Sequence, residues 1–232
     1  MKNTTDKSVM PFFSDKDRWR KELKEGELIS VPQKAWRKYY PVESKLLFSE
    51  LWFADQRVSI VDLKKLAESD VSNRVLFVAA MMWGRGPKNG RLMPKFEEVS
   101  THKSFEETLR KTRELVMEGK PIEAYLAWLD SGVKGIGEAF FTKWFFVCGL
   151  DSQRQGLQSL VLDKRVWKSL TAIGWSSKRQ TGNSYRTDPA GAYGAYLEAV
   201  HVWARELSTS SIKISPLQIE QFLFRKNGKN LL

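Results

Sequence analysis

Apolar residues recur every three or four positions along most of the chain, which is the spacing of a helix that buries one face. Polar residues, glycines and prolines separate these stretches, and no extended stretch alternates between apolar and polar positions as a half-buried strand does. The pattern therefore predicts an all-α or nearly all-α protein. We expect helices over residues 44–53, 63–68, 74–83, 104–118, 121–129, 138–147, 165–173, 190–207 and 217–224.

Several of the expected helices carry sequence signals for their first turn. Ser59 and Asn73 are expected N-caps, because each places a side-chain oxygen just ahead of an apolar helix. Ser104 precedes two glutamates, whose charge favours a helix N-terminus. Ser215 is followed by Pro216, a combination typical of an N-cap and the first helical position.

The helix expected over residues 74–83 (RVLFVAAMMW) is apolar on nearly every side. A helix of this kind is buried, so we expect it to be the central helix of the fold. The next stretch, residues 84–91 (GRGPKNGR), contains three glycines and a proline. These residues are expected to end the helix at Trp83 and to form a cationic loop.

Two closely spaced glycines separate the helix expected over 121–129, with Ile122, Leu126 and Leu129 at helical spacing, from the apolar helix over 138–147. Gly135 and Gly137 allow positive φ angles and a close approach of the backbone to another molecule. The N–H groups at the start of the second helix form an anion site. A helix, a short glycine hairpin and a second helix can hold a DNA phosphate without reading a base.

An aspartate follows this hairpin after a short apolar stretch. Asp163 comes directly after LVL and just before a new helix, and it lies twenty residues beyond Lys143 in the sequence FFTKWFF. The apolar neighbours of Lys143 favour a neutral amine, as nucleophilic attack requires. Non-catalytic roles also fit these residues. Asp163 could simply be the N-cap of the following helix, and Lys143 could be an amphipathic side chain whose amine reaches solvent.

The hairpin sequence VKGIG, its apolar helix and the VLD sequence at the observed spacing resemble the helix-hairpin-helix of the DNA glycosylase superfamily. The resemblance is greatest to the branch with the 8-oxoguanine glycosylase fold, including small bacterial members with a GIGxAFxTK hairpin, and it extends from Arg74 to the C-terminus. It implies two helical subdomains with an active-site cleft between them. It also implies an enzyme that flips a damaged or modified base out of double-stranded DNA and excises it.

The resemblance also implies catalytic roles. Asp163 would stabilise the positive charge that develops at C1′ of the sugar and activate the nucleophile. Lys143 would attack C1′ and form a Schiff base, which leads on to strand cleavage. In the bifunctional members this lysine stands two residues after the second hairpin glycine, where this chain has Ala139. Lys143 lies one helical turn further on, which leaves base removal with water as the nucleophile as the alternative.

Contacts to DNA follow from the same resemblance. Phosphate contacts are expected from Lys134, Gly135 and Gly137. The loop after the central helix would enter the DNA where the base has left, and it contains Arg85, Asn89 and Arg91. An exposed basic turn is the alternative interpretation of that loop.

The base pocket is expected to use aromatic side chains that stack on the flipped base. Each candidate fits a place in the hydrophobic core equally well; the candidates are Trp83, Trp175, Tyr185 and Phe222. Between residues 18 and 40, basic residues alternate with aromatic ones, and here too a nucleic-acid surface and a helix with buried aromatics are both open.

The net charge and the small numbers of cysteines and histidines limit the partners and cofactors that the protein could have. The formal net charge is +11 and the pI is about 9.7, which favours nucleic acid as a partner over an anionic membrane surface. With one cysteine the chain cannot ligate an iron–sulfur cluster, and two histidines make a zinc site improbable. We expect no cofactor, apart from the monovalent cation at the hairpin that the resemblance allows.

The expected organisation is a flexible tip at 1–17, a helical part at 18–73, a helical barrel at 74–173 that includes the hairpin at 121–147, and C-terminal helices at 174–232 that complete the second subdomain with the 18–73 part. Residues 176–188 are polar and expected to be flexible. The N-terminus has no signal-peptide pattern and the longest apolar run is too short for a bilayer. We therefore expect a cytoplasmic, monomeric protein.

Three functions remain open from the sequence. A DNA glycosylase that removes oxidised guanine, or a hypermodified base of phage DNA, accounts for both the hairpin and Asp163. A non-catalytic DNA-binding module accounts for the hairpin alone, because a pure binder has no need of the carboxylate. A structural protein with a basic surface accounts only for the charge. The two substrates imply DNA repair and antiviral defence, respectively.

Overall fold

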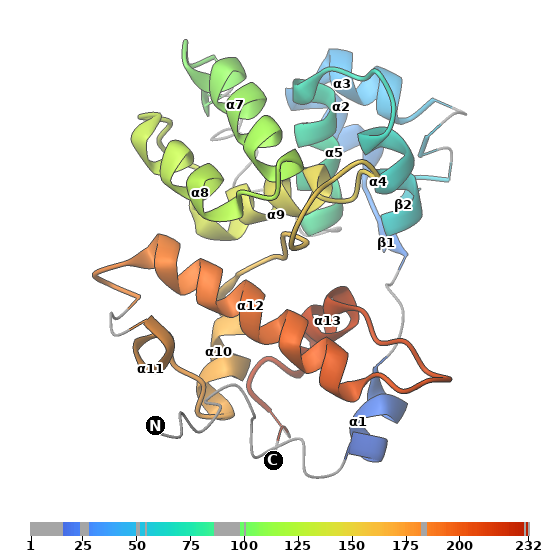
Figure 1. Ribbon diagram of the computed structural model, residues 1–232. Helices are drawn as coiled ribbons and strands as arrows, with labels where there is room; N and C mark the ends of the chain where they lie inside the picture. The colour runs from blue at the N-terminus through green and yellow to red at the C-terminus, as the bar shows by residue number, and fades with distance from the viewer. Residues whose placement is uncertain are drawn as a thin grey trace. The chain divides into compact units, whose positions relative to one another are not determined.

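A computed structural model of the chain describes residues 16–23, 28–49, 52–53, 55–85, 98–99, 101–181, 185–229 and 231. The chain forms two compact units. The hairpin unit is continuous and comprises Gly26–Ser159, whereas the aspartate unit combines Met1–Glu25 with Leu160–Leu232. Both are helical, and the strands within the described residues are two short ones, β1 (Ile29–Ser30) and β2 (Arg57–Val58), paired antiparallel (Figure 1). The prediction of a nearly all-α protein is confirmed.

The hairpin unit is built around one central helix. Besides the strands it contains α2 (Gln33–Tyr39), α3 (Pro41–Leu47), α4 (Ile60–Ala67), α5 (Asn73–Arg85), α7 (Phe105–Met117), α8 (Pro121–Asp130) and α9 (Glu138–Cys148). Helix α5 contacts α3, α4, α7 and α9 (Figure 1). Its residues from Leu76 to Met82 are all buried, which confirms the predicted central helix.

Aromatic rings join α5, α7 and α9. The ring of Phe77 on α5 lies 5.1 Å from that of Phe105 and 6.0 Å from that of Trp144, both measured between centroids. The buried Trp144 Nε1 donates a hydrogen bond of 2.9 Å to Thr112 Oγ1 on α7. These contacts fix α9 against the centre of the unit, and α9 is the helix that follows the glycine hairpin.

Two of the predicted caps differ in their outcome. Ser59 and Asp62 form a capping box, so the predicted cap is confirmed, although the helix begins at Ile60. Asn73 is not the cap of α5, because it already lies within the helix. Ser72 takes that role, and its Oγ accepts a hydrogen bond from Val75 N. Asn73 Oδ1 instead accepts a hydrogen bond of 2.9 Å from Arg113 Nη1.

Three further expectations in this unit are corrected. Helix α3 ends at Leu47 instead of reaching residue 53, because the chain turns at Phe48 and Phe53 N returns to bond Leu47 O. The Ser104 side chain does not cap α7; its Oγ donates to Ser131 O instead. The third correction concerns α8, whose apolar stripe is exposed while its other face is buried. The exposed residues are Ile122, Leu126 and Leu129, and the buried ones are Pro121, Ala124, Tyr125 and Trp128.

The aspartate unit consists of α1 (Lys16–Glu22), α10 (Lys164–Ala172), α11 (Ser177–Thr181), α12 (Pro189–Leu207) and α13 (Pro216–Lys226). Helix α12 packs against α11 and α13, and α13 also packs against α10 (Figure 1). The predicted cap of α13 is confirmed, since Ser215 and Gln218 form a capping box. Within residues 176–188, for which the sequence predicts flexibility, residues 177–181 form the short helix α11.

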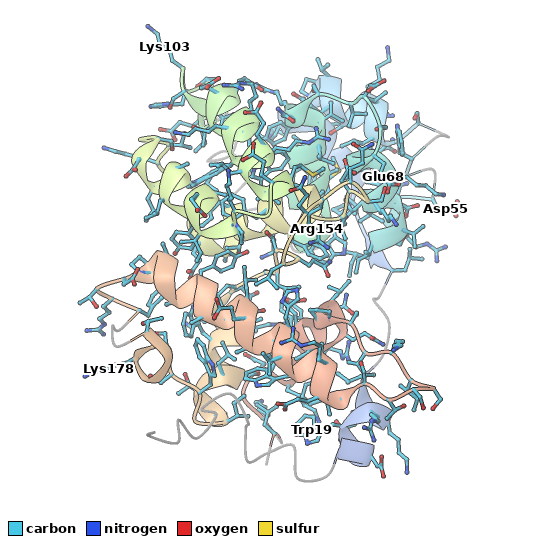
Figure 2. All side chains as sticks on the ribbon, in the orientation of Figure 1. Trp19, Asp55, Glu68, Lys103, Arg154 and Lys178 are labelled. Atoms are coloured by element: carbon cyan, nitrogen blue, oxygen red, sulfur yellow. The ribbon has the colours of Figure 1, made fainter. Side chains whose placement is uncertain are left out.

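The N-terminal helix α1 belongs to the aspartate unit through long-range contacts. Trp19, labelled in Figure 2, packs edge-on against Phe222 with ring centroids 4.5 Å apart. Arg20 Nε donates to Leu207 O at 2.7 Å, and Lys226 Nζ lies 2.6 Å from Glu22 Oε2. The chain therefore leaves this unit after residue 25 and returns to it at residue 160, whereas the sequence suggested divisions after residues 73 and 173.

The aromatic residues between positions 18 and 40 are mostly buried. Trp19, Trp36 and Tyr40 all belong to hydrophobic cores. The interpretation of this stretch as helices with buried aromatic faces is therefore the correct one for these three residues.

After α9 the chain is held to the hairpin unit by a polar loop. Ser152 N donates a hydrogen bond of 3.2 Å to Glu68 Oε1 at the end of α4. Hydrogen bonding by Ser152 lowers the pKa of the Glu68 carboxyl. Arg154 Nε donates to Gly149 O at 2.9 Å, and Figure 2 labels both Glu68 and Arg154. These bonds anchor the segment that leads out of the hairpin unit.

Candidate functional site

The glycine hairpin connects α8 to α9, as the sequence predicts. Gly135 has a φ of +88°, which L side chains rarely adopt, and an added Cβ would lie 3.1 Å from Val99 Cγ2. Gly137 differs from this expectation, because its φ of −80° and ψ of 176° are open to any residue. Gly137 is the N-cap of α9 and makes no side-chain cap. Only the first glycine is thus required by the backbone conformation.

The start of α9 presents backbone donors. Within the described residues, the N–H groups of Gly137 and Ala139 donate no hydrogen bond, whereas Phe140 N donates to Gly137 O at 2.8 Å. Apart from the two residues next to it in the chain, no described residue comes within 4 Å of the position that a Cβ on Gly137 would take. Lys134 is exposed in the same hairpin. Open donors, an exposed cation and an uncovered backbone are the features of an anion site at a helix N-terminus.

One carboxylate shares this helix N-terminus. Glu138 is the first residue of α9, and its Oε1 accepts a hydrogen bond of 2.7 Å from Tyr125 Oη on α8. The bond joins the two helices directly beside the hairpin. It holds the Glu138 side chain toward α8, which restricts where its negative charge lies.

Lys143 is buried in the interior of the hairpin unit. Its side chain is on α9, and the residue is only 6% exposed. Its Nζ donates a hydrogen bond of 2.6 Å to Ala139 O and lies 5.6 Å from the centroid of the Phe140 ring. The interpretation of Lys143 as a surface lysine whose amine reaches solvent is therefore wrong.

The Lys143 side chain points back toward Ala139, the position at which bifunctional glycosylases have their lysine. Side chains on a helix lean toward its N-terminus. The Lys143 amine follows this direction and bonds the carbonyl oxygen of Ala139, the residue at the position of the lysine in bifunctional glycosylases. The side chain thus carries the amine back by about one helical turn, to the backbone of Ala139.

The one thiol of the chain lies on α9, and the aromatic pocket candidate of this unit packs against that helix. Cys148 is fully buried, and burial raises the pKa of its thiol well above the usual value, so it is poorly suited to nucleophilic attack. Trp83 on α5 is half-buried and stacks on Phe146, with ring centroids 5.1 Å apart. Arg85 ends α5, and its side chain lies outside the described part, as do Asn89 and Arg91.

Asp163 is placed at the start of α10 in the aspartate unit. Its Oδ1 accepts hydrogen bonds from Arg165 N at 2.8 Å and from Val166 N at 3.0 Å, so it is the N-cap. Its Oδ2 accepts no hydrogen bond from the described residues. The residue is half-buried. The N-cap interpretation is confirmed, and it leaves the second carboxylate oxygen available for chemistry.

Two buried tyrosines on α12 hold the segment that precedes Asp163. Tyr193 Oη donates to Leu160 O at 2.9 Å, and Tyr196 Oη donates to Val161 O at 3.0 Å. Burial raises the pKa of Tyr196 well above its usual value, and the charges of Glu220 and Asp163 act in the same direction. Tyr196 therefore stays protonated as a donor. The sequence predicts the helix that carries both tyrosines but not this role; their polar hydroxyls on an apolar helix were the available signal.

The remaining pocket candidates fall into two groups. Trp175 and Phe222 are buried core residues, so neither offers a face for stacking on a base. Tyr185 is 37% exposed, and its ring lies 4.8 Å from that of Trp167, which stands one turn after Asp163 on α10. Trp167 was not among the predicted pocket residues.

Charge is unevenly divided between the two units. The aspartate unit has 18 lysines and arginines against 10 acidic residues, whereas the hairpin unit has 20 against 17. Helix α10 contributes the exposed Lys164, Arg165 and Lys168 directly after Asp163. Most of the net charge of +11 is therefore in the unit that carries the candidate carboxylate.

Comparison with known proteins found one family. A family model described as "Putative 8-oxoguanine DNA glycosylase OGG-like protein" matches residues 8–224, which is nearly the whole chain. No curated protein and no solved structure was found to match the chain. Within the described residues, no helix has both the length and the apolar character needed to cross a bilayer.

Proposed function

Because the chain belongs to the OGG-like 8-oxoguanine DNA glycosylase family, we propose that it excises a damaged or modified base from double-stranded DNA, with Asp163 as the catalytic carboxylate. The observation that carries the proposal is the state of this side chain. One oxygen is held by two backbone N–H groups and the other accepts no bond from the described residues. A carboxylate held in this way is fixed in orientation and keeps an oxygen for the reacting sugar.

DNA is held first through its phosphates. The open N–H groups of Gly137 and Ala139 and the amine of Lys134 bind the backbone without reading sequence. The target nucleotide must then leave the stack, since its glycosidic bond cannot be reached inside the duplex. The positive charge of the aspartate unit assists this step by attracting the DNA backbone.

Base removal follows at C1′. As the glycosidic bond breaks, its electron pair leaves with the base and positive charge builds on the sugar, where the Asp163 carboxylate stabilises it. The lone pair of Lys143 Nζ forms the new bond to C1′, and a proton lost from this nitrogen is taken up by the departing base. The C1′–O4′ bond then breaks, its electron pair and the remaining proton of the nitrogen go to O4′, and the nitrogen lone pair completes an imine between the lysine and the DNA.

The alternative nucleophile for the attack on C1′ is a water molecule. In that case Asp163 accepts a proton from water, whose oxygen bonds to C1′, and an abasic site is released without a covalent intermediate. The bond of Lys143 Nζ to Ala139 O supports the lysine route, because it brings the amine toward the position from which bifunctional glycosylases attack.

The test is incubation of the protein with duplexes that each carry a different base, followed by mass spectrometry of the released bases. The panel contains oxidised guanine, hypermodified bases of the kind found in phage DNA, and unmodified controls. Release of one modified base supports the proposal and identifies the substrate. DNA binding with no release from any duplex would instead support the non-catalytic binding module.

The lysine is tested in the same reactions with borohydride, which reduces the imine to a stable protein–DNA adduct. We expect wild-type protein to be trapped during turnover and Lys143→Gln to lose the adduct. Base release without any trapped wild-type protein would contradict the nucleophile assignment and leave Asp163 activating water.

A further inference from the structure

Gly84 faces the Lys143 side chain across the α5–α9 contact. It lies in the last turn of α5, and the two helices pack against each other within the hairpin unit. A Cβ built on Gly84 would lie 2.5 Å from Lys143 Cε and closer still to Cδ. Real Cβ atoms essentially never show such distances, so a methyl group at position 84 and the observed lysine side chain exclude each other.

The backbone gives no other reason for a glycine at this position. Gly84 is helical and has no positive φ, and a glycine inside a helix is unfavourable relative to alanine. The space that it leaves is filled by the middle of the lysine side chain, between the buried stem and the amine bound to Ala139 O. The glycine is therefore explained by the path of Lys143.

We propose that Gly84 is a positioning residue for Lys143: it leaves open the space through which the lysine side chain runs back along α9 and thereby sets the position of the reactive amine. The proposal rests on the proposed function, in which this amine attacks C1′. With any side chain at position 84, the lysine must take another rotamer and its amine moves away from Ala139 O. Attack requires the amine nitrogen and C1′ to lie within about 3–3.5 Å of each other. Displacement of the amine therefore suppresses the lysine reaction, while Asp163 remains in place.

The steric part is tested by thermal unfolding of Gly84→Ala in three backgrounds. With Lys143 present, we expect Gly84→Ala to lower the melting temperature. With Lys143→Met, which keeps the bulk of the side chain without the charge, the melting temperature should fall as well. With Lys143→Ala the obstacle is absent, and Gly84→Ala should raise the melting temperature because alanine favours the helix. A decrease of equal size in all three backgrounds would overturn the steric assignment.

The catalytic part is tested by the ratio of borohydride-trapped adduct to released base. We expect Gly84→Ala to lose the adduct at least tenfold relative to wild type while base release with water falls much less. A general loss of structure would lower both quantities together, and so would overturn the positioning role. Equal trapping ratios for wild type and Gly84→Ala would also overturn it and leave the lysine route intact. A wild-type protein that releases base without being trapped would overturn the nucleophile assignment and, with it, the role of Gly84.

Discussion

The two units of the molecule hold their candidate catalytic groups in opposite surroundings. In the aspartate unit, Asp163 lies half-buried at a helix N-terminus, where backbone N–H groups bind one of its oxygens. In the hairpin unit, Lys143 is buried, and its amine donates a hydrogen bond to a backbone carbonyl oxygen of its own helix and lies over the Phe140 ring. The carboxylate is held by atoms of its own helix. The lysine depends in addition on space left by another helix.

Because of this difference, a substitution can remove the catalytic group without loss of stability more easily in the aspartate unit than in the hairpin unit. Asparagine caps a helix about as well as aspartate, so the charge of Asp163 can be removed with the cap kept. The buried lysine offers no such replacement, because its volume fills the contact between α5 and α9 and its amine bonds a carbonyl oxygen within α9. Variants in the aspartate unit therefore report on chemistry more directly than variants of Lys143.

The largest expected effect is that of Asp163→Asn. Without the negative charge, the developing sugar cation loses its stabilisation, and we expect base release to fall by about 10²- to 10⁴-fold. The melting temperature and the DNA affinity should stay close to wild type, because asparagine retains the cap. Single-turnover base release and thermal unfolding measure the two quantities. Full activity of this variant would remove Asp163 from the mechanism.

The second prediction concerns salt. If four to six phosphates are neutralised, the logarithm of the binding constant should fall against that of the salt concentration with a slope of about −4 to −5. Alanine at the exposed Lys134 should reduce the slope by about 0.9, and alanine at both Lys164 and Lys168 tests whether the basic helix α10 also contacts DNA. A flat salt response would show that the positive charge serves another purpose.

The third prediction concerns the open backbone at Gly137. Leucine at this position should place bulk between α9 and the phosphate, and we expect affinity to fall about tenfold, which is roughly 1.4 kcal/mol, on all sequences alike. Serine is the matched control, since it is small, is a good N-cap, and its Cβ would come within 4 Å of no described residue other than its chain neighbours. A loss confined to one sequence context would argue against a phosphate contact.

The smallest expected effect is that of Tyr196→Phe in the aspartate unit. Loss of the hydrogen bond to Val161 O should reduce the free energy of unfolding by roughly 0.5–1.5 kcal/mol and lower base release modestly, because the segment before Asp163 loosens. Denaturant unfolding and single-turnover kinetics measure the two effects, and unchanged kinetics would limit the hydroxyl to a structural role.

The raised pKa of Tyr196 adds a pH test of the same contact. Above about pH 10 the unfolded state loses the phenol proton while the folded state keeps it, so wild-type stability should decline as pH rises through this range. Tyr196→Phe should decline less steeply. Equal declines would show that the folded protein does not hold this proton as the buried hydrogen bond implies.

Much of the candidate site was predictable because it depends on residues close together in the chain. The glycine hairpin, the cap at Ser59, the cap by Asp163 and the start of α13 at Ser215 all follow from short-range sequence signals, and the structure confirms each of them. At α5 the prediction was wrong by one residue, because Ser72 caps the helix and the predicted cap, Asn73, lies inside it.

Burial was less predictable, because it depends on what each helix packs against. The apolar stripe of α8 is exposed, since the large rings of Tyr125 and Trp128 pack inward against Phe141. In the aspartate unit, Trp175 and Phe222 are buried in the core, whereas Tyr185 and Trp167 are partly exposed. Periodicity identifies the faces of a helix but does not decide which face meets the core.

By itself, the sequence determined the helical class, the hairpin and the capped aspartate, because these depend on backbone preferences and on hydrogen bonds within a few residues. Tertiary structure alone decided the surroundings of the two catalytic candidates. The tyrosines that hold the segment before Asp163 come from α12, and the space for Lys143 is left by Gly84 on α5. Contacts between residues so distant in the chain arise only when helices pack, since packing places side chains within a few ångströms of partners that no local pattern specifies.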